Sequence, residues 1–144
     1  MIKGIGIGRA LHLSIDGSPI GVLPENKLEF TLNGQTYTVR RSGFFSRVCE
    51  LLSDTAILAS IRQPPFVQRY TIACAGREWT LKAEQTIGKR HGLFDGDVRV
   101  GSITPSSGSD YMRDITIDLP KELPLEAQAF LMWLLLWKWD APST

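Results

Sequence analysis

The feature of this sequence that most restricts its fold is an apolar stretch near the end of the chain, Pro124 to Trp139, which reads PLEAQAFLMWLLLWKW. Pro124 suits the first turn of a helix, where its missing N–H group is not needed. From Ala129 to Trp137 no residue is polar, so a helix here has no side suited to water. A helix that is apolar on all sides is surrounded either by protein or by lipid.

The length of this helix favours protein as its surroundings. At ~1.5 Å per residue, residues 124–139 span about 24 Å. The apolar core of a bilayer is about 30 Å thick and needs roughly 20 apolar residues. Glu126, Gln128 and Lys138 shorten the apolar run further. We therefore expect a helix buried in the core, and the alternative is a small tail-anchored membrane protein held by residues 124–139.

Nearly everything before this helix has the pattern of short strands separated by turns. Leu11, Leu13 and Ile15 alternate with other residues and are followed by Asp16-Gly17. Asn33-Gly34 is a strong hairpin signal because both residues tolerate positive φ. Further turns at 53–54, 75–76 and 95–96 divide residues 2–119 into about twelve strands. The last three strand patterns run over 85–94, 97–104 and 111–119.

Many short antiparallel strands need closure, because an open sheet leaves edges that aggregate. A barrel of about twelve strands is too wide for its own side chains to fill. The apolar helix supplies the missing filling, and the barrel supplies the walls that the helix needs. The sequence therefore predicts an all-β fold in one domain, residues 1–144: a closed antiparallel barrel of strands around a hydrophobic C-terminal helix.

This order of elements resembles the tubby C-terminal-like superfamily, which includes tubby proteins, phospholipid scramblases and LURP-one-related proteins. The helix, the strand series and the phrases LNGQTYTVRR (32–41), ILASIRQP (57–64) and RVGSITP (99–105) carry the resemblance. It covers nearly the whole chain as a pattern, without a diagnostic motif, a scramblase calcium site or a tubby phosphoinositide pocket. The resemblance implies a twelve-stranded barrel around a helix and a role in binding lipid or membrane surfaces.

Charge and cysteine content narrow the function classes. The net charge is +1, so attraction to anions has to come from local basic clusters, and no nucleic-acid partner is expected. Cys49 and Cys74 form no metal-binding pattern and lie in apolar strand-like runs, which predicts buried free thiols. The start of the chain lacks the long apolar core of a signal peptide. We expect a cytoplasmic protein, peripheral to membranes if it binds lipid.

Two histidines are the obvious candidates for catalysis. The alternation of residues predicts that His12 faces outward on its strand, and the run Lys89-Arg90-His91 predicts a solvated turn. Neither histidine has a nucleophile and an acid that the sequence places beside it. We therefore expect no catalytic site, no metal and no cofactor, and a protein that is not an enzyme.

The most suggestive surface feature is a pair of basic loops. One of them, residues 40–47, carries three arginines around two phenylalanines, and the other carries a lysine and an arginine. The candidate lipid- or anion-binding residues are Arg40, Arg41, Phe44, Phe45, Arg47, Lys89 and Arg90. Cations contribute about 1 kcal/mol each near an anionic membrane, and apolar loop tips can insert. The competing interpretation is that the phenylalanines cap one mouth of the barrel and the arginines are merely solvated.

The function that these observations favour is a non-catalytic binding module that faces lipid or a membrane surface. A protein-interaction or structural domain without a ligand is the first alternative, and the tail-anchored protein is the second. The expected partners are correspondingly an anionic lipid surface or another protein.

Overall fold

The computed structural model describes residues 2–7, 10–24, 27–42, 47–64, 69–84, 90–105 and 114–140, with the backbone alone for residues 7, 42, 105, 114 and 136–140. These residues form twelve strands and one helix. The elements are β1 (Ile2–Ile7), β2 (Ala10–Ile15), β3 (Ser18–Pro24), β4 (Glu29–Leu32), β5 (Gln35–Ser42), β6 (Arg47–Ser53), β7 (Ala56–Gln63), β8 (Arg69–Cys74), β9 (Arg77–Ala83), β10 (His91–Asp95), β11 (Val98–Pro105), β12 (Asp114–Asp118) and α1 (Leu125–Asp140).

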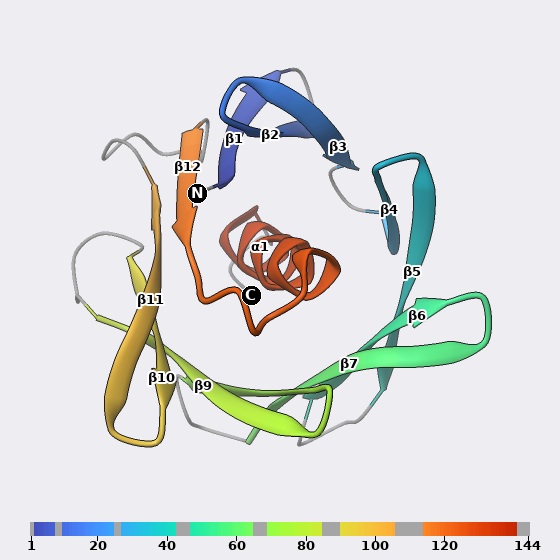
Figure 1. Ribbon diagram of the computed structural model, residues 1–144. Coiled ribbons are helices and arrows are strands. Elements are labelled where there is room, and N and C mark those ends of the chain that lie inside the picture. Colours follow the sequence, from blue (N-terminus) through green and yellow to red (C-terminus); the bar gives the residue numbers. More distant parts are fainter. Residues whose placement is uncertain are drawn as a thin grey trace.

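The strands close into a single antiparallel barrel (Figure 1). Each strand pairs with its neighbours in the chain, and β1 pairs with β12 to close the ring. The predicted all-β barrel around one helix is therefore confirmed. Because the ring is closed, each described strand has a partner on both sides, and the shortest pairing joins β3 to β4 at Gly21–Leu32 and Val22–Thr31.

The up-and-down course of the chain gives the barrel two different ends. The turn end carries the tight hairpin turns at 16–17, 33–34, 54–55, 75–76 and 96–97, and also the segment 119–124 that leads into α1. The loop end carries the other strand ends and the longer connections. Asn33 and Gly34 have φ values of 51° and 79°, as two-residue hairpins require, so the local sequence determines which end each turn occupies.

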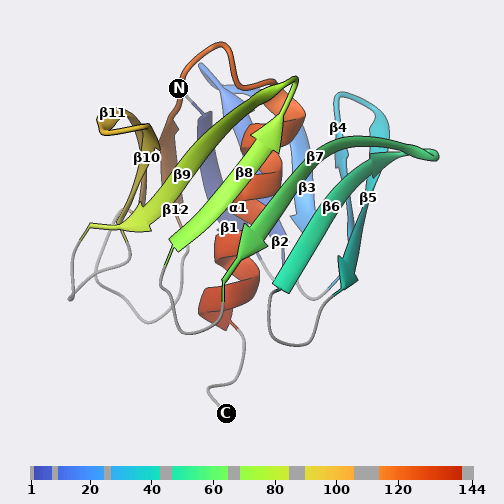
Figure 2. The same ribbon diagram turned by 90° about the horizontal axis from the view of Figure 1, so that it is seen from below.

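The helix α1 passes through the barrel from the turn end to the loop end (Figure 2). Ala127 and every residue from Ala129 to Leu135 are buried. The indole N–H of Trp133 donates a hydrogen bond of 2.9 Å to the backbone carbonyl of Lys27. This bond attaches the helix to the connection between β3 and β4. Within the described part of the chain, no helix is long and apolar enough to cross a membrane.

Two details of the sequence-based interpretation need correction. Residue 90 lies within the strand predicted over 85–94 but is not part of a strand, and β10 begins at His91; β12 ends at Asp118, one residue before the predicted end at residue 119. Residues 85–89 and 111–113 lie outside the described residues. His91 is not part of a solvated turn but is 3% exposed. It pairs with Ile103, whose side chain fills the core, so the strand alternation turns His91 inward as well. Cys49 and Cys74 are buried free thiols, as predicted.

Candidate functional site

The topology brings the two predicted basic segments to the same end of the barrel. Arg41 lies next to the last residue of β5, Arg47 is the first residue of β6, and Arg90 immediately precedes β10. All three positions adjoin connections at the loop end. Of the other predicted residues, Phe44, Phe45 and Lys89 lie outside the described residues.

Arg41 and Arg47 belong to the inner side of the barrel wall at this end. Arg41 pairs with Cys49 across β5 and β6, and Arg47 precedes Cys49 by two residues, so all three share one face. Burial raises the pKa of the Cys49 thiol, and the charges of Arg41 and Arg47 lower it in part. The side chains of Arg41 and Arg47 are exposed although strand alternation directs them toward the barrel interior, because they lie at the loop-end termini of β5 and β6. They therefore form part of the barrel mouth.

Arg40 is separated from these two arginines by the strand alternation. It lies on the outer face, where it faces Glu50 across the ladder between β5 and β6. Its Nε and Nη2 groups donate hydrogen bonds of 2.9 and 2.7 Å to the same carboxylate oxygen of Glu50. Arg40 is thus held in an outer-face ion pair, away from the mouth.

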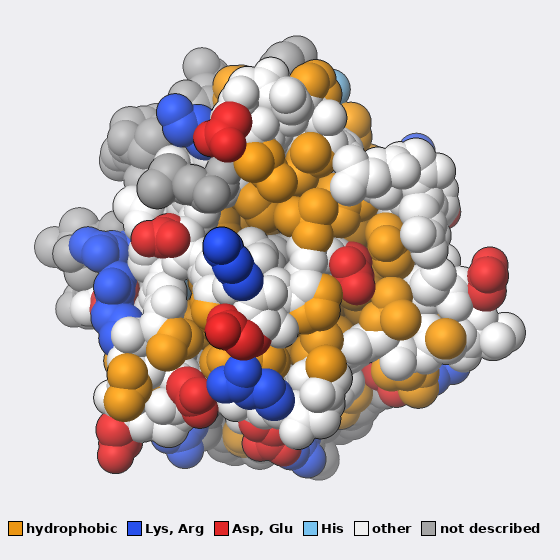
Figure 3. Space-filling model, viewed as in Figure 1, with side chains coloured by type: hydrophobic (Ala, Val, Ile, Leu, Met, Phe, Trp, Pro, Cys, Tyr) orange, Lys and Arg blue, Asp and Glu red, His pale blue; other side chains and the backbone are white. Residues whose placement is uncertain are grey.

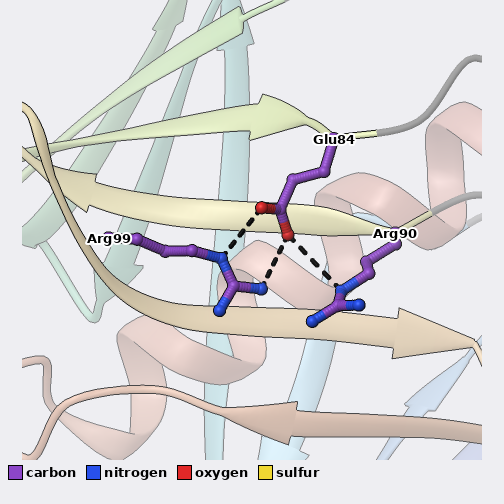
Figure 4. Close-up of polar contacts among 3 residues, drawn as sticks. All are labelled: Glu84, Arg90 and Arg99. Atoms are coloured by element: carbon purple, nitrogen blue, oxygen red, sulfur yellow. Dashed lines mark hydrogen bonds and ion pairs between the residues drawn. The ribbon is translucent and has the colours of Figure 1, made fainter.

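Arg90 belongs to a cluster of three charged side chains on the outer face (Figure 4). Glu84 follows β9, and its carboxylate extends across β10 to Arg99 of β11, which donates hydrogen bonds of 2.8 and 2.7 Å from Nε and Nη2. Gly92 makes this crossing possible, because a Cβ atom there would lie 2.8 Å from the Glu84 carboxyl carbon. The hydrogen bonds from Arg99 are the largest cause that lowers the pKa of Glu84.

Most charges of the described side chains are separated along the barrel axis, a distribution that was not predicted from the sequence. The loop end carries Lys27, Arg41, Arg47, Arg62, Arg69, Lys82 and Arg90, with Glu29 and Glu84 as the described carboxylate side chains and Asp114 at the start of β12. The turn end carries Asp16, Asp54, Glu78, Asp95, Asp97, Asp118, Glu122 and Glu126, against Lys3, Arg77, Arg99 and Lys121.

This separation has a local cause at the turn end. Tight hairpin turns favour Asp because its short side chain tolerates turn conformations, and every such turn lies on one end of the barrel. Figure 3, which looks onto the turn end, shows carboxylates both at its rim and near its centre, together with Lys and Arg side chains and with apolar side chains between them. A signal was present in the sequence, since residues that flank the tight turns fall at one end of the barrel and residues that flank the longer connections fall at the other. The pattern becomes visible only when the strands are placed side by side.

The described residues contain no group of three or more His, Cys, Asp or Glu side chains that could hold a metal ion. Comparison of this chain with protein-family models, with curated proteins and with solved structures found no match. The resemblance to the tubby-like superfamily therefore stays a prediction, and the geometry and charge of the barrel are the observations that bear on function.

Proposed function

We propose that this protein is a non-catalytic binding module that docks the loop end of its barrel on an anionic lipid surface. The observation that supports this function best is the separation of charge along the barrel axis. A chain with a net charge of +1 has little overall attraction to anions. Most of the described cations lie at the loop end and most of the described carboxylates at the turn end, so the loop end attracts anions more strongly than the turn end does.

The size of the effect follows from the number of cations that can approach the surface. Arg47 and Arg69 are exposed at the loop end and form no ion pair within the described part of the chain. Each cation near an anionic membrane contributes about 1 kcal/mol. Neutralising both should weaken binding by about 2 kcal/mol, which is about 30-fold in affinity.

The test is co-sedimentation with vesicles that contain phosphatidylserine, at low and high salt. The variant Arg47→Gln with Arg69→Gln is compared with Lys3→Gln and Lys121→Gln, which make the same change of charge at the turn end. The proposal predicts a loss of about 30-fold for the first pair and less than threefold for the second. Equal losses would show that net charge, not the loop end, controls binding, and unchanged binding by the first pair would exclude these arginines.

The same proposal places the protein in the cytoplasm, bound peripherally to a membrane. The surface potential of the cytoplasmic leaflet is negative, and it falls off within about a Debye length. Binding of this kind is reversible and sensitive to salt. Fractionation of cells in buffers of increasing ionic strength tests the placement, because a peripheral protein leaves the membrane fraction as salt is raised.

A protein-interaction domain is the second candidate, and the exposed apolar residues at the turn end favour it. Ile57 and Val98 flank hairpin turns there and are 54% and 64% exposed. Under this candidate, the double variant Ile57→Ser and Val98→Ser loses a partner in pull-down experiments while vesicle binding is unchanged. The lipid proposal instead predicts that Ile57→Ser with Val98→Ser loses no partner and that Arg47→Gln with Arg69→Gln loses vesicle binding, so comparison of the three double variants in both assays separates the two candidates.

A further inference from the structure

The cluster of Glu84, Arg90 and Arg99 contains one carboxylate and two guanidinium groups (Figure 4). Arg99 engages both oxygens of Glu84 through a two-point contact, the strongest geometry for this pair. Arg90 is bound less closely, because its Nε lies 3.4 Å from one of the same oxygens. This Nε is buried and has no hydrogen-bond acceptor among the described residues. The positive charge of Arg90 is therefore left over after Glu84 has been neutralised by Arg99.

The position of Arg90 is fixed by its backbone as well as by its charge. The backbone N–H of Glu84 donates a hydrogen bond of 3.0 Å to the carbonyl oxygen of Arg90, which ties together the two ends of the connection between β9 and β10. The Arg90 side chain is 43% exposed. A cation that is held in place and still open to solvent needs little ordering before it binds an anion.

From these contacts we propose that Arg90 binds a phosphate group, with Glu84 and Arg99 as its positioning residues. A guanidinium group matches phosphate because its planar N–H groups can donate to two oxygens at once. The phosphate can belong to a lipid headgroup or be free in solution. The lipid version of this inference rests on the proposed function, whereas the free-phosphate version does not.

The first test follows the Arg90 Nε–H signal by nitrogen-15 NMR during titration with inorganic phosphate, with chloride adjusted to keep the ionic strength constant. The signal is identified by its absence in Arg90→Lys. A saturable shift of the Arg90 signal, larger than that of Arg99, is expected. A shift that only follows ionic strength would overturn the phosphate site, because a screening effect does not saturate with phosphate.

The second test compares Arg90→Lys with Arg62→Lys, a matched substitution of an exposed loop-end arginine that forms no ion pair in the described part of the chain. Vesicles with phosphatidic acid, whose phosphate is terminal, are compared with phosphatidylserine vesicles of equal surface charge. We expect Arg90→Lys to lose at least threefold more affinity for phosphatidic acid than for phosphatidylserine, and Arg62→Lys to show no such difference.

The combined outcomes separate this inference from the proposed function. If all variants bind vesicles and Arg90→Lys behaves like Arg62→Lys, the headgroup site is excluded and the lipid-binding function stands. If no vesicle binding occurs but the Arg90 signal shifts saturably with phosphate, the site binds free phosphate and the proposed function is wrong.

Discussion

Truncation of one helix side chain, Leu131→Ala, measures how firmly the barrel encloses α1. Leu131 is fully buried. Leu→Ala substitutions in cores cost about 2 to 5 kcal/mol, and the cost is larger where the surroundings cannot collapse into the cavity. A closed ring of hydrogen-bonded strands collapses poorly, so we expect the free energy of unfolding to fall by about 3 kcal/mol. At roughly 3 °C per kcal/mol for a domain of this size, the melting temperature should fall by about 10 °C.

The matched control is Leu28→Ala, which removes the same atoms from a side chain that is 44% exposed. Its cost should be about 0.5 kcal/mol or less. Urea unfolding followed by tryptophan fluorescence is a suitable assay, because Trp79 and Trp133 are both 2% exposed and become solvated on unfolding. If Leu131→Ala is no more destabilising than Leu28→Ala, the helix is not packed within the barrel and the reasoning fails.

Three further substitutions or conditions test other parts of the fold. Gly21→Ala should lower the free energy of unfolding by at least about 3 kcal/mol, because the new Cβ would lie 2.2 Å from the carbonyl oxygen of Thr31 on the neighbouring strand. Chemical unfolding measures this change, and near-wild-type stability would show that β3 and β4 are packed less closely than described. Burial raises the pKa of Cys49, so the thiol should resist alkylation at pH 8 until the protein is unfolded, and rapid labelling of the native protein would contradict its burial. For the same reason, the contribution of Cys49 to stability should decline as the pH rises above about 9. The pKa of Glu84 is lowered, chiefly by Arg99, so the contribution of Glu84 to stability should be present at neutral pH and decline as the pH falls below about 4.5. The substitution Glu84→Gln should remove this part of the pH dependence. Parallel profiles of stability against pH for the variant and the wild-type protein would refute this expectation.

The fold could be predicted because its main determinants are local. Turn residues such as Asn33-Gly34 specify hairpins on their own, and the helix at 124–139 needs walls whatever their order. The barrel then follows from the need to pair every strand edge. Turn residues set the number of strands locally, and the apolar helix together with the cost of unpaired edges requires that these strands close.

The candidate site was harder to predict because it depends on register. Whether Arg40 shares a surface with Arg41 or pairs with Glu50 is decided by strand alternation and by the residue directly opposite. The contact from Glu84 to Arg99 crosses an intervening strand and depends on Gly92 having no side chain. His91 was misplaced for a related reason, since its charged neighbours suggested a turn although the strand pairing begins at that residue.

The orientation of the barrel on an anionic membrane tests the central claim most directly. Glu29 lies at the loop end and Asp54 at the turn end, both are exposed, and replacing either by Cys makes the same change of charge. A fluorescent label is attached to each variant, and quenching by spin-labelled lipid headgroups is measured on phosphatidylserine vesicles. Docking through the loop end predicts strong quenching of the label at residue 29 and little at residue 54. Equal quenching, or stronger quenching at residue 54, would contradict docking through the loop end.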